Sequence, residues 1–171
     1  MISLSIFRMF RFLIFLGSIV AVTYAHSVGA PASVCESMTP GHSVDPQTTP
    51  SPYDILLSKN SILGGEPITV TIKGRDKEEF KGILLQARLG DKIVGTFDVD
   101  PADINVQTID CPKGERNAVT HKNAENKSEV SVRWIAPPDL VGDVVFKLTV
   151  VKEFKTFWVA QSSSPLSIHR Q

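Results

Sequence analysis

Residues 68–73 read Ile-Thr-Val-Thr-Ile-Lys, and this alternation of apolar and polar side chains decides the fold. The same alternation occurs further along the chain, at residues 130–134 (Val-Ser-Val-Arg-Trp) and residues 144–150 (Val-Val-Phe-Lys-Leu-Thr-Val). Side chains of a β-strand point alternately to opposite faces, so a period of two predicts strands with one buried face. The sequence therefore predicts a protein built from strands.

Shorter segments with strand composition lie between turns that contain glycine or proline. A chain with about seven or eight short strands closes most simply as an all-β, immunoglobulin-like antiparallel β-sandwich. Helical turns are expected at 75–80 and at 100–103. The further predicted strands are residues 53–58, 82–89, 93–99, 104–109 and 156–161.

The 171 residues divide into a leader and one domain. Two arginines, a short apolar run and the ending Thr-Tyr-Ala are typical of a secretory signal peptide. A membrane anchor is the alternative, but the run of about 11 residues is well short of the roughly 20 that span a bilayer. The predicted parts are a signal peptide (1–25), a proline-rich extended lead-in (26–52), the β-sandwich (53–161) and a C-terminal tail (162–171).

Cleavage after Ala25 would remove two of the 18 basic residues and no acidic residue, which leaves 16 basic against 18 acidic residues and a net charge of −2. Nucleic-acid binding normally requires a basic surface, so this charge argues against a nucleic-acid partner. No other apolar stretch approaches the length of a membrane span, and we expect no transmembrane segment in the mature chain.

The mature chain keeps two cysteines, Cys35 and Cys111. In the oxidising compartment of a secreted protein the default is one disulfide between them. Such a bridge would fasten the lead-in to the body of the domain and stabilise the fold by roughly 4–5 kcal/mol in the chain-entropy model. The alternative is two free thiols.

The sequence contains no recognisable catalytic or metal-binding motif. It has no Gly-x-Ser-x-Gly nucleophile turn, and its four histidines lack the spacing of a zinc site. His26 would become the N-terminal residue after cleavage, and an N-terminal histidine that binds copper is an alternative for it. We predict a protein that is not an enzyme and that has no cofactor or metal. The histidines are His26, His42, His121 and His169, and the clustered carboxylates of an expected solvated edge are Asp98, Asp100, Asp103 and Asp110.

Two features could engage other molecules. Lys152, Lys155 and Trp158 are the candidate ligand-binding residues, because a cation beside an aromatic face suits anionic amphiphiles or glycans. Packing in the core is the alternative for Trp158. Asn126 begins the sequon Asn-Lys-Ser in a polar stretch, which predicts an N-glycosylated surface loop, with an unmodified asparagine as the alternative.

A series of short strings, taken in order, resembles the reeler domain, the module at the N-terminus of reelin. The resemblance covers roughly residues 29–160 and rests on the strings together, since none is specific alone. The strings are Gly29-Ala30-Pro31, Cys35, Met38-Thr39-Pro40-Gly41-His42, Pro52-Tyr53, residues 68–72, residues 80–88, Gly95-Thr96-Phe97, Cys111, Ala118-Val119-Thr120-His121 and residues 132–137.

The resemblance implies an immunoglobulin-like sandwich with a disulfide. In small insect defence proteins, including the moth nodulation factor, it implies secretion into haemolymph and an innate-immunity role. The implied partners are microbial cell-surface lipids or polysaccharides, such as lipopolysaccharide, lipoteichoic acid or β-glucan, and haemocytes that aggregate in response. An extracellular adhesion module that binds host proteins is the alternative, because one fold hosts several functions.

Overall fold

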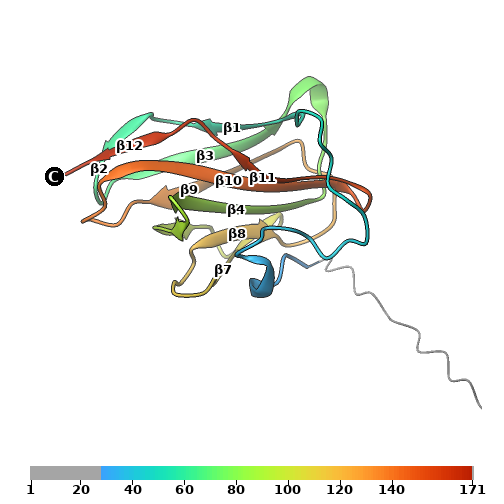
Figure 1. Ribbon diagram of the computed structural model, residues 1–171, viewed down its shortest axis with the longest axis horizontal. Helices are drawn as coiled ribbons and strands as arrows, with labels where there is room; N and C mark the ends of the chain where they lie inside the picture. Colours follow the sequence, from blue (N-terminus) through green and yellow to red (C-terminus); the bar gives the residue numbers. More distant parts are fainter. Residues whose placement is uncertain (1–27, 171) are drawn as a thin grey trace, which may run out of the picture.

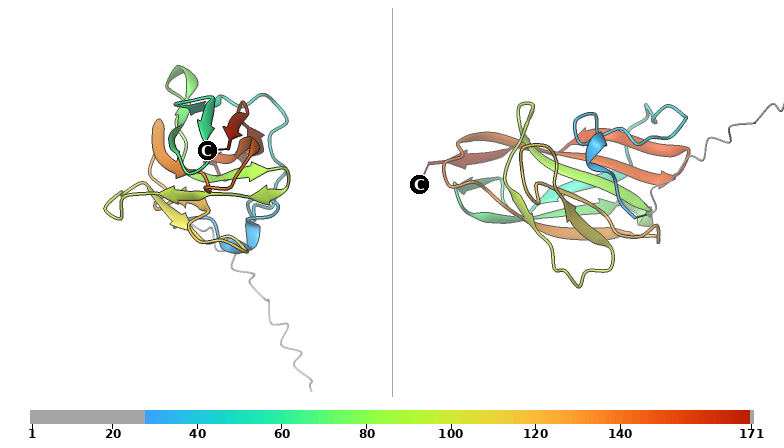
Figure 2. Two further views of the ribbon diagram at one scale, coloured as in Figure 1. Left: turned by 90° about the vertical axis from the view of Figure 1, so that its left-hand side faces the viewer. Right: turned by 90° about the horizontal axis from the view of Figure 1, so that it is seen from below.

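The computed structural model describes residues 28–170, which form two β-sheets packed face to face (Figures 1 and 2). This confirms the predicted all-β sandwich, with more strands than expected because several are only two to four residues long. The strands are β1 (Tyr53–Leu57), β2 (Ser61–Leu63), β3 (Pro67–Gly74), β4 (Gly82–Leu89), β5 (Lys92–Ile93), β6 (Thr96–Asp98), β7 (Val106–Ile109), β8 (Ala118–His121), β9 (Glu129–Ile135), β10 (Gly142–Glu153), β11 (Thr156–Ser162) and β12 (Leu166–His169).

The first sheet has the strand order β1-β3-β9-β6 and is antiparallel throughout. Its inner face carries the apolar residues of the deciding stretch, while its outer face carries paired charges. Lys73 contacts Glu129 at 2.8 Å, and Arg133 contacts Asp98 at 3.3 Å. Pairs this exposed stabilise a fold by less than about 1 kcal/mol each, so the outer face is a solvated surface. The buried residues of β3 are Ile68, Val70 and Ile72.

The second sheet has the order β2-β12-β10-β4-β8-β7, and β11 also pairs with β10. The 12-residue β10 runs along β4 on one side, and β12 and β11 share its other side. Within the segment expected as a C-terminal tail, Ser162 and Leu166–His169 are therefore strand residues of this sheet. Leu166 and Ile168 are buried there, and the short apolar–polar alternation that places them was missed in the sequence.

Large aromatic side chains fill the space between the sheets. Trp134 is fully buried, meets Phe146 edge-on with ring centroids 5.3 Å apart, and donates its indole N–H to the carbonyl of Val94 at 3.2 Å. A buried indole needs such a partner, because an unsatisfied N–H in the core costs about 1–3 kcal/mol. In the sequence, Trp134 is the last apolar residue of the alternation at residues 130–134, which predicted that it faces the core.

The lead-in covers the outer face of the second sheet, so β4 is buried on both faces (Figure 1). Leu85 faces the core between the sheets, whereas its neighbour Leu84 packs in a small second core beneath the lead-in. The predicted disulfide between Cys35 and Cys111 is present, with Cα atoms 5.7 Å apart. It joins the lead-in to the segment after β7, which is the stapling role predicted for it.

Three local expectations differ from the structure. The strand β8 was not predicted, although it lies between β4 and β7. The helix expected at 75–80 is one 3-10 turn at Arg75–Lys77, which ends early because Asp76 and Lys77 have positive φ angles of 51° and 64°. The strand expected at 93–99 is divided into β5 and β6.

Candidate functional site

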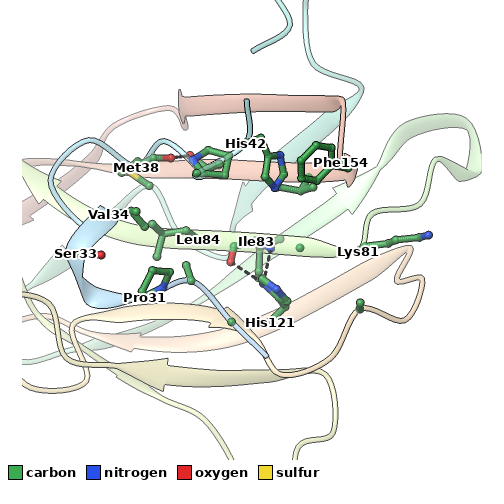
Figure 3. A pocket seen from close by; sticks show the side chains of 18 residues that line it. Pro31, Ser33, Val34, Met38, His42, Lys81, Ile83, Leu84, His121 and Phe154 are labelled. Atoms are coloured by element: carbon green, nitrogen blue, oxygen red, sulfur yellow. Dashed lines mark hydrogen bonds between the residues drawn. The ribbon is translucent and has the colours of Figure 1, made fainter. Parts of the chain in front are cut away.

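An apolar pocket lies between the lead-in and the outer face of the second sheet (Figure 3). Its volume is about 490 Å³, within the range of roughly 300–1,000 Å³ that small-molecule sites occupy. Gly82, Ile83 and Leu84 of β4 form its floor together with Val151 of β10, and lead-in residues between 29 and 42 form its walls. The site is thus made by covering a sheet face with a separate segment of chain.

Polar side chains of the sheet hold the lead-in in place by bonding to its backbone. The amide N–H of Ala30 donates to the hydroxyl of Thr120 at 2.7 Å, and the hydroxyl of Thr149 donates to the carbonyl of Met38 at 2.7 Å. The side-chain amide of Gln86 donates to the carbonyl of Cys35 at 3.0 Å. These sheet residues are buried, so their bonds to the lead-in are shielded from water and fix the pocket walls.

Two glycines permit the close approach of the segments around the pocket. Gly29 has φ +106°, and a Cβ there would lie 2.9 Å from both Gln107 and Thr120. Gly82 leaves part of the floor without a side chain, because a Cβ there would lie 3.2–3.3 Å from His121 and Val151. A residue with a side chain at either position would push against a wall of the pocket.

Two imidazoles border the pocket. The Nδ1 atom of His121 accepts a hydrogen bond from the backbone N–H of Ile83 at 3.3 Å, one residue beyond the last backbone pair between β8 and β4, Thr120 with Leu84 (Figure 3). His42 stacks on Phe154 with ring centroids 4.5 Å apart and meets Phe157 edge-on at 5.0 Å. The ring of His121 thus bonds to the backbone of β4, and the ring of His42 packs between aromatic side chains.

Burial lowers the pKa of His42 below its ordinary value, against a smaller opposing effect of the Phe154 backbone. Its Nδ1 atom is buried and has no hydrogen-bond partner among residues 28–170. The neutral ring is therefore the favoured form near neutral pH, and the mouth of the pocket carries no charge from this side.

The three predicted ligand-binding residues do not form one site. Trp158 is buried in the core and donates its indole N–H to the carbonyl of Thr49 at 2.9 Å, which corresponds to the core alternative stated for it. Lys152 is paired with Glu78 at 2.6 Å outside the apolar pocket, and Lys155 is exposed in the turn between β10 and β11. A ligand role for the lysines stays a prediction.

The predicted glycosylation site is exposed. The side-chain amide of Asn126 donates to Glu79 at 2.9 Å at the surface, which leaves modification of this asparagine a prediction. The neighbouring Lys127 is buried, and its ammonium group donates to oxygens of Lys81, Asn123 and Glu125 at 2.7–3.2 Å. A lysine in the sequon thus anchors the loop that presents the asparagine.

The clustered carboxylates serve the backbone around them. Asp98 pairs with Arg133, and Asp100 and Asp103 accept backbone N–H groups of their own turn. Asp110 accepts the N–H of Arg116 at 2.6 Å. Within the part of the chain that the structure describes, no group of three or more histidine, cysteine or acidic side chains could hold a metal ion, and no helix is long and apolar enough to cross a membrane. His26 and the predicted signal peptide lie outside the described residues.

Comparison with known proteins places this architecture in a family. A family model described as the reeler domain matches residues 33–171. The chain belongs to the reeler domain family. Over 161 residues it is 47% identical to "Putative defense protein 3" of the moth Antheraea mylitta, an alignment that covers 94% of this chain and 97% of the relative.

Reeler domains also occur within other proteins. The crystal structure of the Reelin-N domain of F-spondin superposes with a TM-score of 0.60 at 21% identity, covering 74% of this chain and 91% of that chain, which supports the fold. "Putative ferric-chelate reductase 1" of Danio rerio is 32% identical over 157 residues, but these make up 27% of that protein. The reeler domain is thus shared by proteins of different length and name.

The hydrogen bonds that hold the lead-in over the pocket of this reeler domain were missed in the sequence analysis, whereas the disulfide was predicted. Thr120, Gln86 and Thr149 look like ordinary strand residues, and their partners lie 90, 51 and 111 positions away. A polar residue at a fully buried strand position is the available signal, because such a side chain must find a hydrogen-bond partner.

Proposed function

We propose that this reeler domain protein is secreted and acts in defence by binding molecules of the microbial surface without transforming them. The observation that carries the proposal is the alignment with the Antheraea mylitta protein, whose name describes it as a defence protein and which is matched over 97% of its length. The proposed ligands are lipopolysaccharide, lipoteichoic acid or β-glucan. The proposed consequence is nodulation by haemocytes in the haemolymph.

The disulfide supports the proposed export. Cys35 and Cys111 are bridged, and both are almost fully buried beneath the lead-in. Disulfides form and persist mainly in secreted and extracellular proteins, since the cytosol keeps thiols reduced. The leader-like sequence at residues 1–25 agrees with the same destination.

The chemistry of the pocket supports binding rather than catalysis. Among the described residues that line it, the ionisable side chains are His42, His121 and Lys81, and no acidic side chain is present. The hydroxyl of Thr149 is already engaged with the backbone of Met38. This set lacks the paired carboxylates or the activated nucleophile that acid–base or covalent catalysis would use.

A binding assay on whole microbes tests this proposal. The natural mature protein, purified with its disulfide intact, is incubated at physiological salt with Gram-negative bacteria, Gram-positive bacteria and yeast, and the pelleted fraction is measured. We expect retention on at least one microbe well above that of a heat-denatured control, followed by haemocyte aggregation when the coated cells are added. Retention no greater than the control on all three microbes would refute the proposal, and binding to host matrix proteins alone would establish the adhesion alternative.

A further inference from the structure

We infer that the pocket beneath the lead-in holds the acyl chain of an anionic amphiphile, with the head group outside the pocket beside Lys81. The inference rests on the proposed function and specifies which part of a microbial surface molecule the domain would contact. It identifies a chemical class, a lipid with a negative head group, of which one acyl chain enters the pocket. A bare polysaccharide is the alternative that the structure disfavours.

The floor of the pocket suits a hydrocarbon chain. Leu84 and Val151 offer apolar side chains from two neighbouring strands, and Val34 and Met38 face them from the lead-in (Figure 3). Gly82 lowers the floor between them because it has no side chain. These surfaces belong to elements that are fastened by the disulfide and by buried hydrogen bonds, so the site is preformed and loses little freedom on binding.

The polar groups at the pocket floor are already bonded within the protein. Thr149 donates to Met38 at 2.7 Å and accepts from Ala160 at 3.1 Å, while His121 accepts from Ile83. A sugar ring brings several hydroxyl groups that lose water on entry and need new partners, and each unsatisfied group is costly. An acyl chain makes no such demand, which is why this pocket favours the lipid part of a glycolipid.

The volume fits one chain. The pocket volume is about 490 Å³. A cavity of about 150 Å³ accommodates a six-carbon benzene ring, so scaling by volume gives an upper limit of about 20 carbons for one chain. A second copy of this protein would need a wide, flat surface, whereas this site is a pocket between a segment and a sheet (Figure 3).

The charge at one end of the pocket fits an anionic head group. Lys81 extends outward beyond His121 and Phe154 with its amine exposed, and it is the one lysine or arginine among the described lining residues (Figure 3). No acidic side chain lines the pocket to oppose it. Phe154 is 46% exposed at the tip of the β10–β11 hairpin and extends the apolar rim at the same end. The chain would therefore lie between the lead-in and the outer face of the second sheet, with its head group beside Lys81.

Displacement of a fluorescent fatty acid tests the site. The full mature protein is loaded with cis-parinaric acid, which is then displaced by octanoate, decanoate, dodecanoate, tetradecanoate and hexadecanoate below their micelle concentrations. Each buried methylene should strengthen binding roughly fourfold until the pocket is full. Affinity that does not depend on chain length, or no displacement at all, would overturn the inference.

A charge reversal tests the head-group contact. The exposed Lys81→Glu variant should weaken hexadecanoate binding by roughly three- to tenfold and leave hexadecanol binding unchanged, because the alcohol has no charge. Lys92→Glu on the exposed strand β5, away from the pocket, is the matched control and should change neither. Equal losses in both lysine variants, or equal losses for acid and alcohol, would refute the contact with Lys81.

Blocking the pocket connects the two proposals. Val151→Trp should abolish fatty-acid displacement, and its circular dichroism and thermal midpoint report whether the fold is kept. If that variant is unfolded, Ala124→Trp at the exposed rim serves the same purpose. Microbial retention without fatty-acid binding by the natural protein would refute the acyl site alone. Fatty-acid binding without microbial retention would refute the proposed function and leave the pocket assignment standing.

Discussion

Tyr53 permits a direct test of the core described above, because it would be the single tyrosine of a chain cleaved at the predicted site after Ala25. The side chain is 4% exposed, and its hydroxyl donates to the backbone carbonyl of Glu79 at 2.7 Å. Its ring packs edge-on against Phe80 and Trp158, with centroids 5.6 and 5.7 Å apart. Burial, with a smaller contribution from the charge of Glu78, raises the pKa of Tyr53 to about 12.

The raised pKa of Tyr53 makes the folded protein less stable as the pH rises above 10. In the unfolded chain Tyr53 loses its proton near its ordinary pKa of about 10, while the folded protein keeps that proton until about 12. The stabilisation from the protonated hydroxyl is therefore complete below pH 10 and is lost as the pH rises towards 12. Its size is at most about 2–3 kcal/mol, and less to the extent that water reaches the hydroxyl.

Tyrosinate absorbance in the near ultraviolet measures this pKa in the mature protein, and urea unfolding at a series of alkaline pH values measures the loss of stability. Tyr53→Phe is the matched control. It should cost about 1 kcal/mol through the lost hydrogen bond to Glu79 and should remove this part of the pH dependence. A tyrosinate midpoint near 10, in a protein whose circular dichroism is still native, would show that the hydroxyl is solvated and that the reasoning is wrong.

Three further outcomes are expected. Replacing Cys35 and Cys111 by alanine removes a disulfide between residues 76 positions apart. This should lower the free energy of unfolding by about 4–5 kcal/mol, measured by urea unfolding. An unchanged urea midpoint would contradict the stapling role. Gly29→Ala should lower the free energy of unfolding by about 1–3 kcal/mol, because Gly29 has a positive φ and a crowded Cβ position. Gly41→Ala is the control and should be nearly neutral, because no atom lies within 4 Å of its Cβ position. Equal thermal midpoints for the two variants would argue against a conformational requirement at Gly29. Asn126→Gln should reduce the mass of the protein secreted by insect cells to that of the enzymatically deglycosylated natural form. If the untreated natural protein and the untreated variant have the same mass apart from the substitution, the sequon is not used.

Strands with a clear alternation were predictable from local sequence, and β3 and β9 show why. Each has an apolar residue at every second position, and burial of one face follows from that spacing alone. The strands β8 and β12 have four residues each, too few to establish a period, and become strands because β4 and β10 provide edges for them. Their formation is decided by pairing with distant segments.

The adjacent aromatics of β11 illustrate a second limit. Phe157 and Trp158 point to opposite faces of the strand, yet both are buried. Trp158 belongs to the core between the sheets, while Phe157 is covered by the lead-in, whose Gln47 N–H bonds to the carbonyl of Phe157 at 2.8 Å. Alternation assigns the two faces correctly but does not reveal that a third layer of chain covers the outer one. The same covering segment creates the pocket, which is why the candidate site could not be predicted from periodicity.

The positions of the two chain ends have a consequence for how this domain can be used in longer polypeptides. The described chain begins near one end of the long axis, and after β12 it ends near the other (Figures 1 and 2). A polypeptide that contains such a unit passes through it lengthwise, so the unit acts as a rigid spacer that holds preceding and following modules apart. The pocket lies along the side of that spacer, and its access would not depend on what is attached at the C-terminal end.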